Sequence, residues 1–91
     1  METVRLRISG RVQGVGYRFW AEQTAHRLGL QGWVRNRADG SVEILATGMA
    51  ANIAALAEAC RRGPRAADVE HVAVEPAADD GSAGFTARPT L

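Results

Sequence analysis

The sequence predicts a ferredoxin-like α+β sandwich, in which two helices cover one face of an antiparallel sheet of four or five strands. The first observation behind this prediction is the order of the expected elements, β-α-β-β-α-β with a hairpin in the middle. The second is the length of 91 residues, which suits one compact domain over residues 1–91. The third is composition: 46% hydrophobic and 23% charged residues describe an ordinary globular chain.

The first strand and the first helix are predicted from two different periodicities. Residues 3–12 alternate strictly, with aliphatic side chains on one face and arginine or serine on the other, as in a half-buried strand. A glycine-rich turn follows at residues 13–16. Residues 17–28 then place apolar side chains on one helical stripe, and Arg27 and Gly29 are typical of a helix C-terminus. A helix is therefore expected to begin directly after the turn.

The rest of the chain supplies four more strands and a second helix. Residues 31–37 and 42–47 read as two strands joined by a short turn. Residues 49–62 carry apolar side chains at helical spacing and end in Arg-Arg-Gly-Pro, which is a clear helix stop. A fourth strand is expected at residues 69–75, and after a loop rich in Asp, Ala and Gly a short final strand at residues 85–88.

The register of the central hairpin follows from side-chain parity. A two-residue turn would set aliphatic against charged side chains and mix the two faces. A three-residue turn that ends in a left-handed glycine pairs Val34 with Ile44 and Arg35 with Glu43. The second register also puts Asn36 on the same face as Val34, which is the face that the helices cover.

Charge and cysteine content exclude several classes of protein. The 11 basic residues, all arginine, nearly balance 10 acidic ones, so electrostatic binding of nucleic acid is not expected. The absence of lysine rules out Schiff-base chemistry and a Walker lysine. One cysteine, Cys60, permits no internal disulfide, and no apolar run follows Met1, so we expect a cytoplasmic protein without a membrane segment. His26 and His71 lie far apart in a chain without a ligand cluster, so neither a metal nor another cofactor is expected.

The first segment that could carry chemistry runs from Gly10 to Arg18, between a strand and a helix N-terminus. Glycines there let backbone N–H groups converge on an anion, and the first N–H groups of the helix are unpaired. Arg18 stands at the end of the helix where a cation is unfavourable unless an anion neutralises it. Its planar fork of donors suits a phosphate. The alternative is a plain tight turn with Arg18 pointing into solvent.

The second segment runs from Gly29 to Gly40. Asn36 lies at the end of a strand, on the helix-covered face and just before the turn, where it is close enough to solvent to be hydrated. A carboxamide both donates and accepts, so Asn36 could orient a water molecule beside a phosphate. The alternative is that Asn36 only satisfies backbone groups of the turn.

Together the two segments resemble the acylphosphatase family. Its hallmark is Gly-x-Val-Gln-Gly-Val-x-[Phe/Tyr]-Arg followed by Gly-x-x-Gly-x-Val-x-Asn-x-x-Asp-Gly-x-Val, and the chain matches these motifs at residues 10–18 and 29–42 without a gap. Length and element order match as well, and the match is weakest after Pro64.

The resemblance implies a metal-free, cofactor-free hydrolase that cleaves acyl phosphates into a carboxylate and inorganic phosphate. It implies that Asn36 positions the attacking water and that Arg18 binds the phosphoryl group. The implied phosphate-binding residues are Gln13, Gly14, Val15, Gly16, Tyr17 and Arg18. It also implies a monomer that acts on a small molecule, with no nucleic-acid or membrane partner.

Two other functions remain open from the residues alone. A non-catalytic anion-sensing module would need the loop but not Asn36. A single-stranded RNA binder would need aromatic side chains on the open sheet face, where the first strand instead places Arg5, Arg7 and Ser9.

Overall fold

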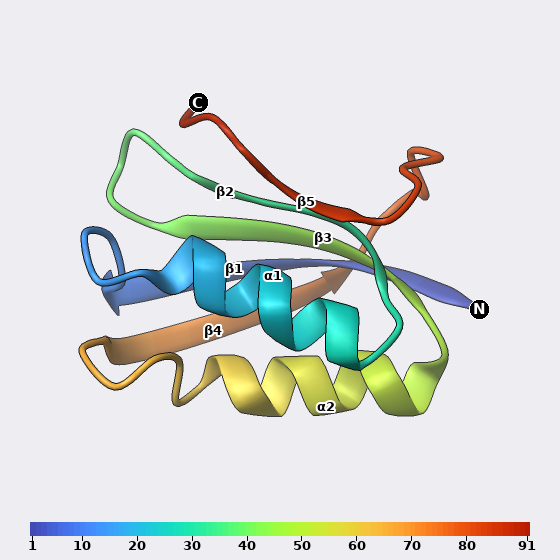
Figure 1. Cartoon of the computed structure of the whole chain (residues 1–91), viewed down its shortest axis with the longest axis horizontal. Helices are drawn as coiled ribbons and strands as arrows, with labels where there is room; N and C mark the ends of the chain where they lie inside the picture. Colours follow the sequence, from blue (N-terminus) through green and yellow to red (C-terminus); the bar gives the residue numbers. More distant parts are fainter.

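The computed structural model describes residues 1–91 as five strands and two helices in the predicted order (Figure 1). The elements are β1 (Glu2–Arg11), α1 (Tyr17–Arg27), β2 (Gln31–Asn36), β3 (Val42–Gly48), α2 (Ala50–Cys60), β4 (Asp68–Pro76) and β5 (Phe85–Arg88). Both helices lie on one face of the sheet, as the alternation in β1 predicted (Figure 1). Neither helix has the length and apolar character that crossing a membrane requires.

The sheet has the strand order β4-β1-β3-β2-β5 and is mixed, whereas the sequence predicted a wholly antiparallel sheet. The exception is β5, which pairs with β2 in parallel. The segment between β4 and β5 crosses one end of the sheet to the opposite edge, so β5 must run against β4. Because β2 also runs against β4, β5 and β2 share a direction.

The β2–β3 hairpin has the predicted register. Val34 lies opposite Ile44, and the backbone N–H of Arg37 donates to the carbonyl oxygen of Ser41 at 2.8 Å, which closes a three-residue turn. Gly40 ends that turn with a φ of 95°, a conformation that side chains rarely adopt. Each side chain of the hairpin therefore lies on the face that the predicted register assigns to it.

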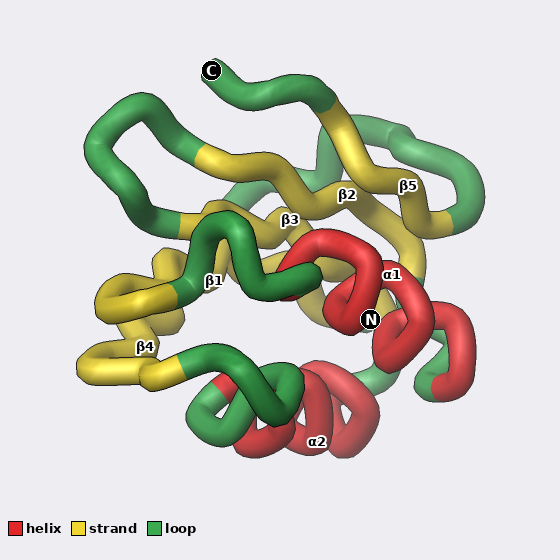
Figure 2. Tube along the Cα trace, turned by 60° about the vertical axis from the view of Figure 1, so that its left-hand side comes forward, coloured by secondary structure: helices red, strands yellow, loops and turns green.

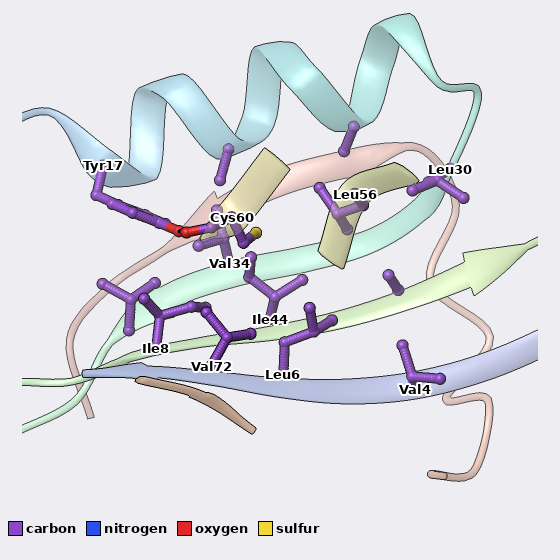
Figure 3. Close-up of a cluster of buried hydrophobic side chains, with 14 of the residues drawn as sticks. Val4, Leu6, Ile8, Tyr17, Leu30, Val34, Ile44, Leu56, Cys60 and Val72 are labelled. Carbon is purple, nitrogen blue, oxygen red and sulfur yellow. Dashed lines mark hydrogen bonds between the residues drawn. The ribbon is translucent and has the colours of Figure 1, made fainter. Parts of the chain in front are cut away.

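The hydrophobic core lies between the helices and the sheet (Figure 3). It includes side chains from every element. Cys60 belongs to it, as predicted: burial raises the pKa of its thiol to about 11, so the group stays protonated at neutral pH. The largest side chains that are fully buried are Tyr17, Phe85, Leu6, Ile8, Ile44, Leu56, Val12, Val34, Val42 and Cys60.

One buried carboxylate organises the opposite, open face of the sheet. Glu43 on the central strand β3 is 3% exposed, and its carboxylate lies 2.9 Å from Arg35 Nε, 3.1 Å from Arg37 Nη1 and 2.9 Å from Arg5 Nε. Burial alone would raise the pKa of this carboxyl, but the hydrogen bond from Arg35 and the three positive charges outweigh burial and lower it. Glu43 is therefore ionised and joins three strands.

We expect Glu43→Gln to lower the free energy of unfolding by about 2 kcal/mol at pH 7, because three arginines lose their shared anion. The loss stays below that of a fully buried pair, since the arginines partly reach solvent. The folded pKa is depressed, so this contribution is present above the unfolded value of about 4.3 and is lost as the pH falls. Urea titrations at pH 7 and pH 3 measure the difference.

Glu58→Gln is the control, because Glu58 pairs with Arg61 at 3.4 Å on the exposed surface of α2. Its effect should stay within about 0.5 kcal/mol. A Glu43→Gln deficit that is the same size at both pH values would contradict the ionic role of Glu43.

Candidate active site

The loop between β1 and α1 presents a row of unpaired backbone donors. Gly14 and Gly16 adopt φ angles of 73° and 81°, and Gly16 is the N-cap of α1 without a side-chain cap. The first turn contains no acidic residue, and no backbone N–H from Gly14 to Phe19 donates to a protein acceptor. A helix N-terminus with these properties favours an anion, which would both accept hydrogen bonds and meet the positive end of the helix dipole.

Two side chains fix the position of this loop. The Gln13 Nε2 amide donates to the carbonyl oxygens of Arg37 at 2.8 Å and Ser41 at 2.9 Å, which ties the loop to the β2–β3 turn. The Tyr17 hydroxyl donates to the carbonyl oxygen of Cys60 at 2.7 Å, and burial raises the pKa of Tyr17, which keeps the hydroxyl a donor. The β1–α1 loop and the β2–β3 turn accordingly lie at the same end of the molecule (Figure 2).

A pocket of about 320 Å³ opens beside the N-terminus of α1. It brings Arg18 and Asn36 together, as well as Gly16 and Tyr17, although these residues come from two separate motifs. Gln13, Gly14 and Val15, which the sequence also suggested as phosphate ligands, do not line it. The lining residues are Gly16, Tyr17, Arg18, Phe19, Glu22, Asn36 and Ala87.

Arg18 is half-buried against β5 and does not point freely into solvent. One of its guanidinium nitrogens, Nη1, donates to the carbonyl oxygen of Arg88 at 3.2 Å. No carboxylate lies within ion-pair distance of Arg18. The guanidinium is thus fixed through one of its nitrogens, and no carboxylate neutralises its charge beside the pocket.

Asn36 ends β2 with its side chain on the helix-covered face, as the register predicted. Its backbone carbonyl accepts a hydrogen bond from the N–H of Leu91 at 3.1 Å. Its side-chain carboxamide makes no hydrogen bond within the protein. The side chain of Asn36 therefore does not hydrogen-bond to backbone groups of the turn, which was the alternative role. The carboxamide lines the pocket without a partner from the protein.

A second hollow of about 310 Å³ lies on the open face of the sheet. Its cations already have partners: Arg5 lies 2.9 Å from Glu43 and 3.7 Å from Glu75, and Arg7 lies 3.9 Å from Asp39. No group of three or more His, Cys, Asp or Glu side chains lies close enough together to hold a metal ion. The pocket beside α1 is thus where free polar groups gather.

Three residues that line this pocket were not predicted from the sequence. Phe19 and Glu22 lie one turn apart on α1, on the stripe that also carries Arg18, and helical spacing could have placed them there. Ala87 gave no signal, because only the packing of α1 on β5 brings it to the site. His26 strengthens that packing, since its Nε2 donates to the carbonyl oxygen of Phe85 at 2.8 Å.

Comparison with known proteins places the chain among close relatives. The sequence pattern of the family described as Acylphosphatase matches residues 4–87. The acylphosphatase of Rhodospirillum rubrum is 52% identical over 91 residues, which are the whole of both chains, and that of Cupriavidus pinatubonensis is 50% identical over 91 residues, again the whole of both.

Solved structures agree with these sequence relatives. The crystal structure of acylphosphatase from Bacillus subtilis superposes with a TM-score of 0.93 at 36% identity and covers 97% of this chain and 99% of that one. An acylphosphatase structure from Coxiella burnetii gives a TM-score of 0.92 at 34% identity, covering 96% and 92% of the two chains. Sequence and fold agree over nearly the full length, and the chain therefore belongs to the acylphosphatase family.

Proposed function

We propose that the protein hydrolyses the carboxyl–phosphate anhydride of small acyl phosphates in the pocket beside α1. The observation that carries this proposal is the meeting of Arg18, unneutralised at a helix N-terminus, with the free carboxamide of Asn36 in one pocket. The resemblance to the acylphosphatase family leads us to expect that a monomer is active. The continuous core supports a single domain over residues 1–91.

The phosphoryl group is proposed to sit at the N-terminus of α1. Its oxygens would accept from the unpaired N–H groups of the loop that ends at Gly16 and from the free donors of Arg18. A cation at this helix end costs a few tenths to about 1 kcal/mol, and a bound phosphate removes that cost. Gln13 would act by positioning the loop, because its side chain is already bonded to the β2–β3 turn.

The attacking water is proposed to be held by Asn36. The oxygen of this water attacks phosphorus while the bond between phosphorus and the acyl oxygen breaks. The carboxylate leaves with the electron pair of that bond. Phosphoryl transfer passes through a loose transition state, so positioning and charge stabilisation suffice without a covalent nucleophile. Asn36 cannot take a proton at neutral pH, so the water proton passes to the substrate phosphate or to solvent.

Turnover of acetyl phosphate by the purified protein tests the proposal directly. Release of inorganic phosphate above the spontaneous rate is the expected result. Binding of phosphate without turnover would instead indicate an anion-sensing module.

We expect Arg18→Ala to lower kcat/KM for acetyl phosphate at least about thirtyfold, which corresponds to a loss of about 2 kcal/mol of transition-state stabilisation. Arg18→Lys should recover little, because a point charge cannot form two parallel hydrogen bonds. The control is Arg62→Ala, which removes an exposed arginine just after α2. A fully active Lys variant would show that charge alone is needed.

Replacement of Asn36 should separate chemistry from binding. We expect Asn36→Ala to lower kcat about 100-fold, by analogy with the loss of one positioned donor, while the inhibition constant of inorganic phosphate stays within about twofold. Asn52→Ala, on α2 and outside the pocket, is the matched control. A parallel collapse of phosphate affinity would place Asn36 in the phosphate site and refute its water-holding role.

An anion should stabilise the folded protein through the same loop. Inorganic phosphate at ten times its Kd should add about 1.4 kcal/mol to the free energy of unfolding and raise Tm. The shift should vanish in Arg18→Ala. Thermal melts with chloride at matched ionic strength provide the comparison, and equal shifts in both proteins would move the anion site elsewhere.

A further inference from the structure

Besides Gly16, Tyr17, Arg18 and Asn36, the pocket is lined by Phe19, Glu22 and Ala87, and these three residues are called its extension. Phe19 is 67% exposed, which is unusual for a large aromatic side chain, and Ala87 on β5 offers a second apolar surface. Glu22 is half-buried and takes part in no ion pair. The extension is thus apolar on two sides and contains one carboxylate without a counter-charge.

The position of Glu22 along α1 determines which part of a bound acyl phosphate its carboxylate would contact. Gly16 and Glu22 are six residues apart, so the carboxylate belongs to a part of α1 about 9 Å farther along the axis than the proposed phosphate position. Arg18 and Glu22 have the i, i+4 spacing that favours pairing, but the Arg18 guanidinium donates to Arg88 and the two side chains form no ion pair. The Glu22 carboxylate is therefore left without an ion-pair partner in the part of the pocket farther from the proposed phosphate position.

We propose that Glu22 is a specificity-determining residue that selects against acyl groups with a second negative charge and favours neutral or cationic ones. The inference rests on the proposed acyl-phosphate hydrolysis. With the phosphate at the N-terminus of α1, an acyl group that runs along the helix passes Phe19 and reaches Glu22. A carboxylate on the acyl group would then meet a like charge, whereas an apolar or cationic group would not.

Coulomb's law bounds the size of the effect. Two like charges about 6 Å apart change a rate or binding constant by about threefold in bulk water and by about a hundredfold at an effective dielectric constant of 20. Glu22 is neither fully exposed nor fully buried, so about tenfold is expected. The effect should also weaken as salt screens the charges.

Three benzoyl phosphates, one unsubstituted and two substituted at the para position, test the proposal, because a rigid ring carries the charge away from the phosphate and prevents cyclisation. They are benzoyl phosphate, 4-carboxybenzoyl phosphate and 4-(trimethylammoniomethyl)benzoyl phosphate. The measured quantity is the ratio of kcat/KM values, which cancels any effect of Glu22 on the phosphate that all three share. Rates are divided by the spontaneous rate of each compound.

The wild-type protein should prefer benzoyl over 4-carboxybenzoyl phosphate about tenfold and should accept the cationic compound at least as well as the neutral one. Glu22→Gln should bring all three within about threefold of one another, and Glu22→Asp should keep part of the preference. The control with the same charge change is Glu2→Gln, at the end of β1 remote from the loop, which should leave the wild-type preference intact. Raising the salt concentration should shrink the wild-type ratio and needs no variant.

The failures can be told apart. Equal kcat/KM for the three compounds in the wild type would overturn the role of Glu22 and leave the hydrolase function standing. An equal loss on all three in Glu22→Gln would also overturn it, because it would assign Glu22 to catalysis or folding. Failure of the wild type to hydrolyse any acyl phosphate would overturn the hydrolase function and this inference together.

Discussion

The site depends on the Gln13 carboxamide, which bonds two carbonyl oxygens of the β2–β3 turn. This contact holds the loop before α1 next to the strand end that carries Asn36. The Tyr17 hydroxyl fixes the other side of the loop by its bond to the last residue of α2. The Gln13 and Tyr17 side chains thus hold both segments in place. As a result the N–H donors of α1 and the Asn36 carboxamide on β2 lie beside one pocket.

A polar network covers Trp33 on the open face of the sheet. The Trp33 ring contacts the guanidinium groups of Arg35 at 4.6 Å and Arg88 at 4.9 Å, and its Nε1 donates to Asp80 at 2.9 Å. Hydrogen bonds from Ser82 and Trp33 lower the pKa of the Asp80 carboxyl to about 2, so this acceptor stays ionised. At 5% exposure the indole is covered, and it offers no surface on which a nucleic-acid base could stack.

The sequence predicted those parts of the structure that depend on neighbouring residues in the chain or on the alternation of side chains between the two faces of the sheet. Alternation in β1, the glycine turn, and the pairing of Val34 with Ile44 each follow from residues close in the chain. They put Arg18 in the first turn of α1 and Asn36 at the end of β2, where the structure has them. The expected antiparallel direction of β5 was wrong, because the sequence of a four-residue strand does not indicate which strand it pairs with. Ala87 and the Arg88 carbonyl could not be foreseen for the same reason: only the packing of α1 on β5 brings them to the pocket.

The strand order β4-β1-β3-β2-β5 has a consequence for how the chain acquires its shape. Only the β2–β3 hairpin joins strands that are consecutive in sequence, so every other pairing must close a long loop and contact order is high. The wall that holds Arg18 and contributes Ala87 belongs to β5, the last strand. During synthesis the pocket therefore stays incomplete until β5 has left the ribosome, and a hydrogen-bonding edge of β2 stays open until then.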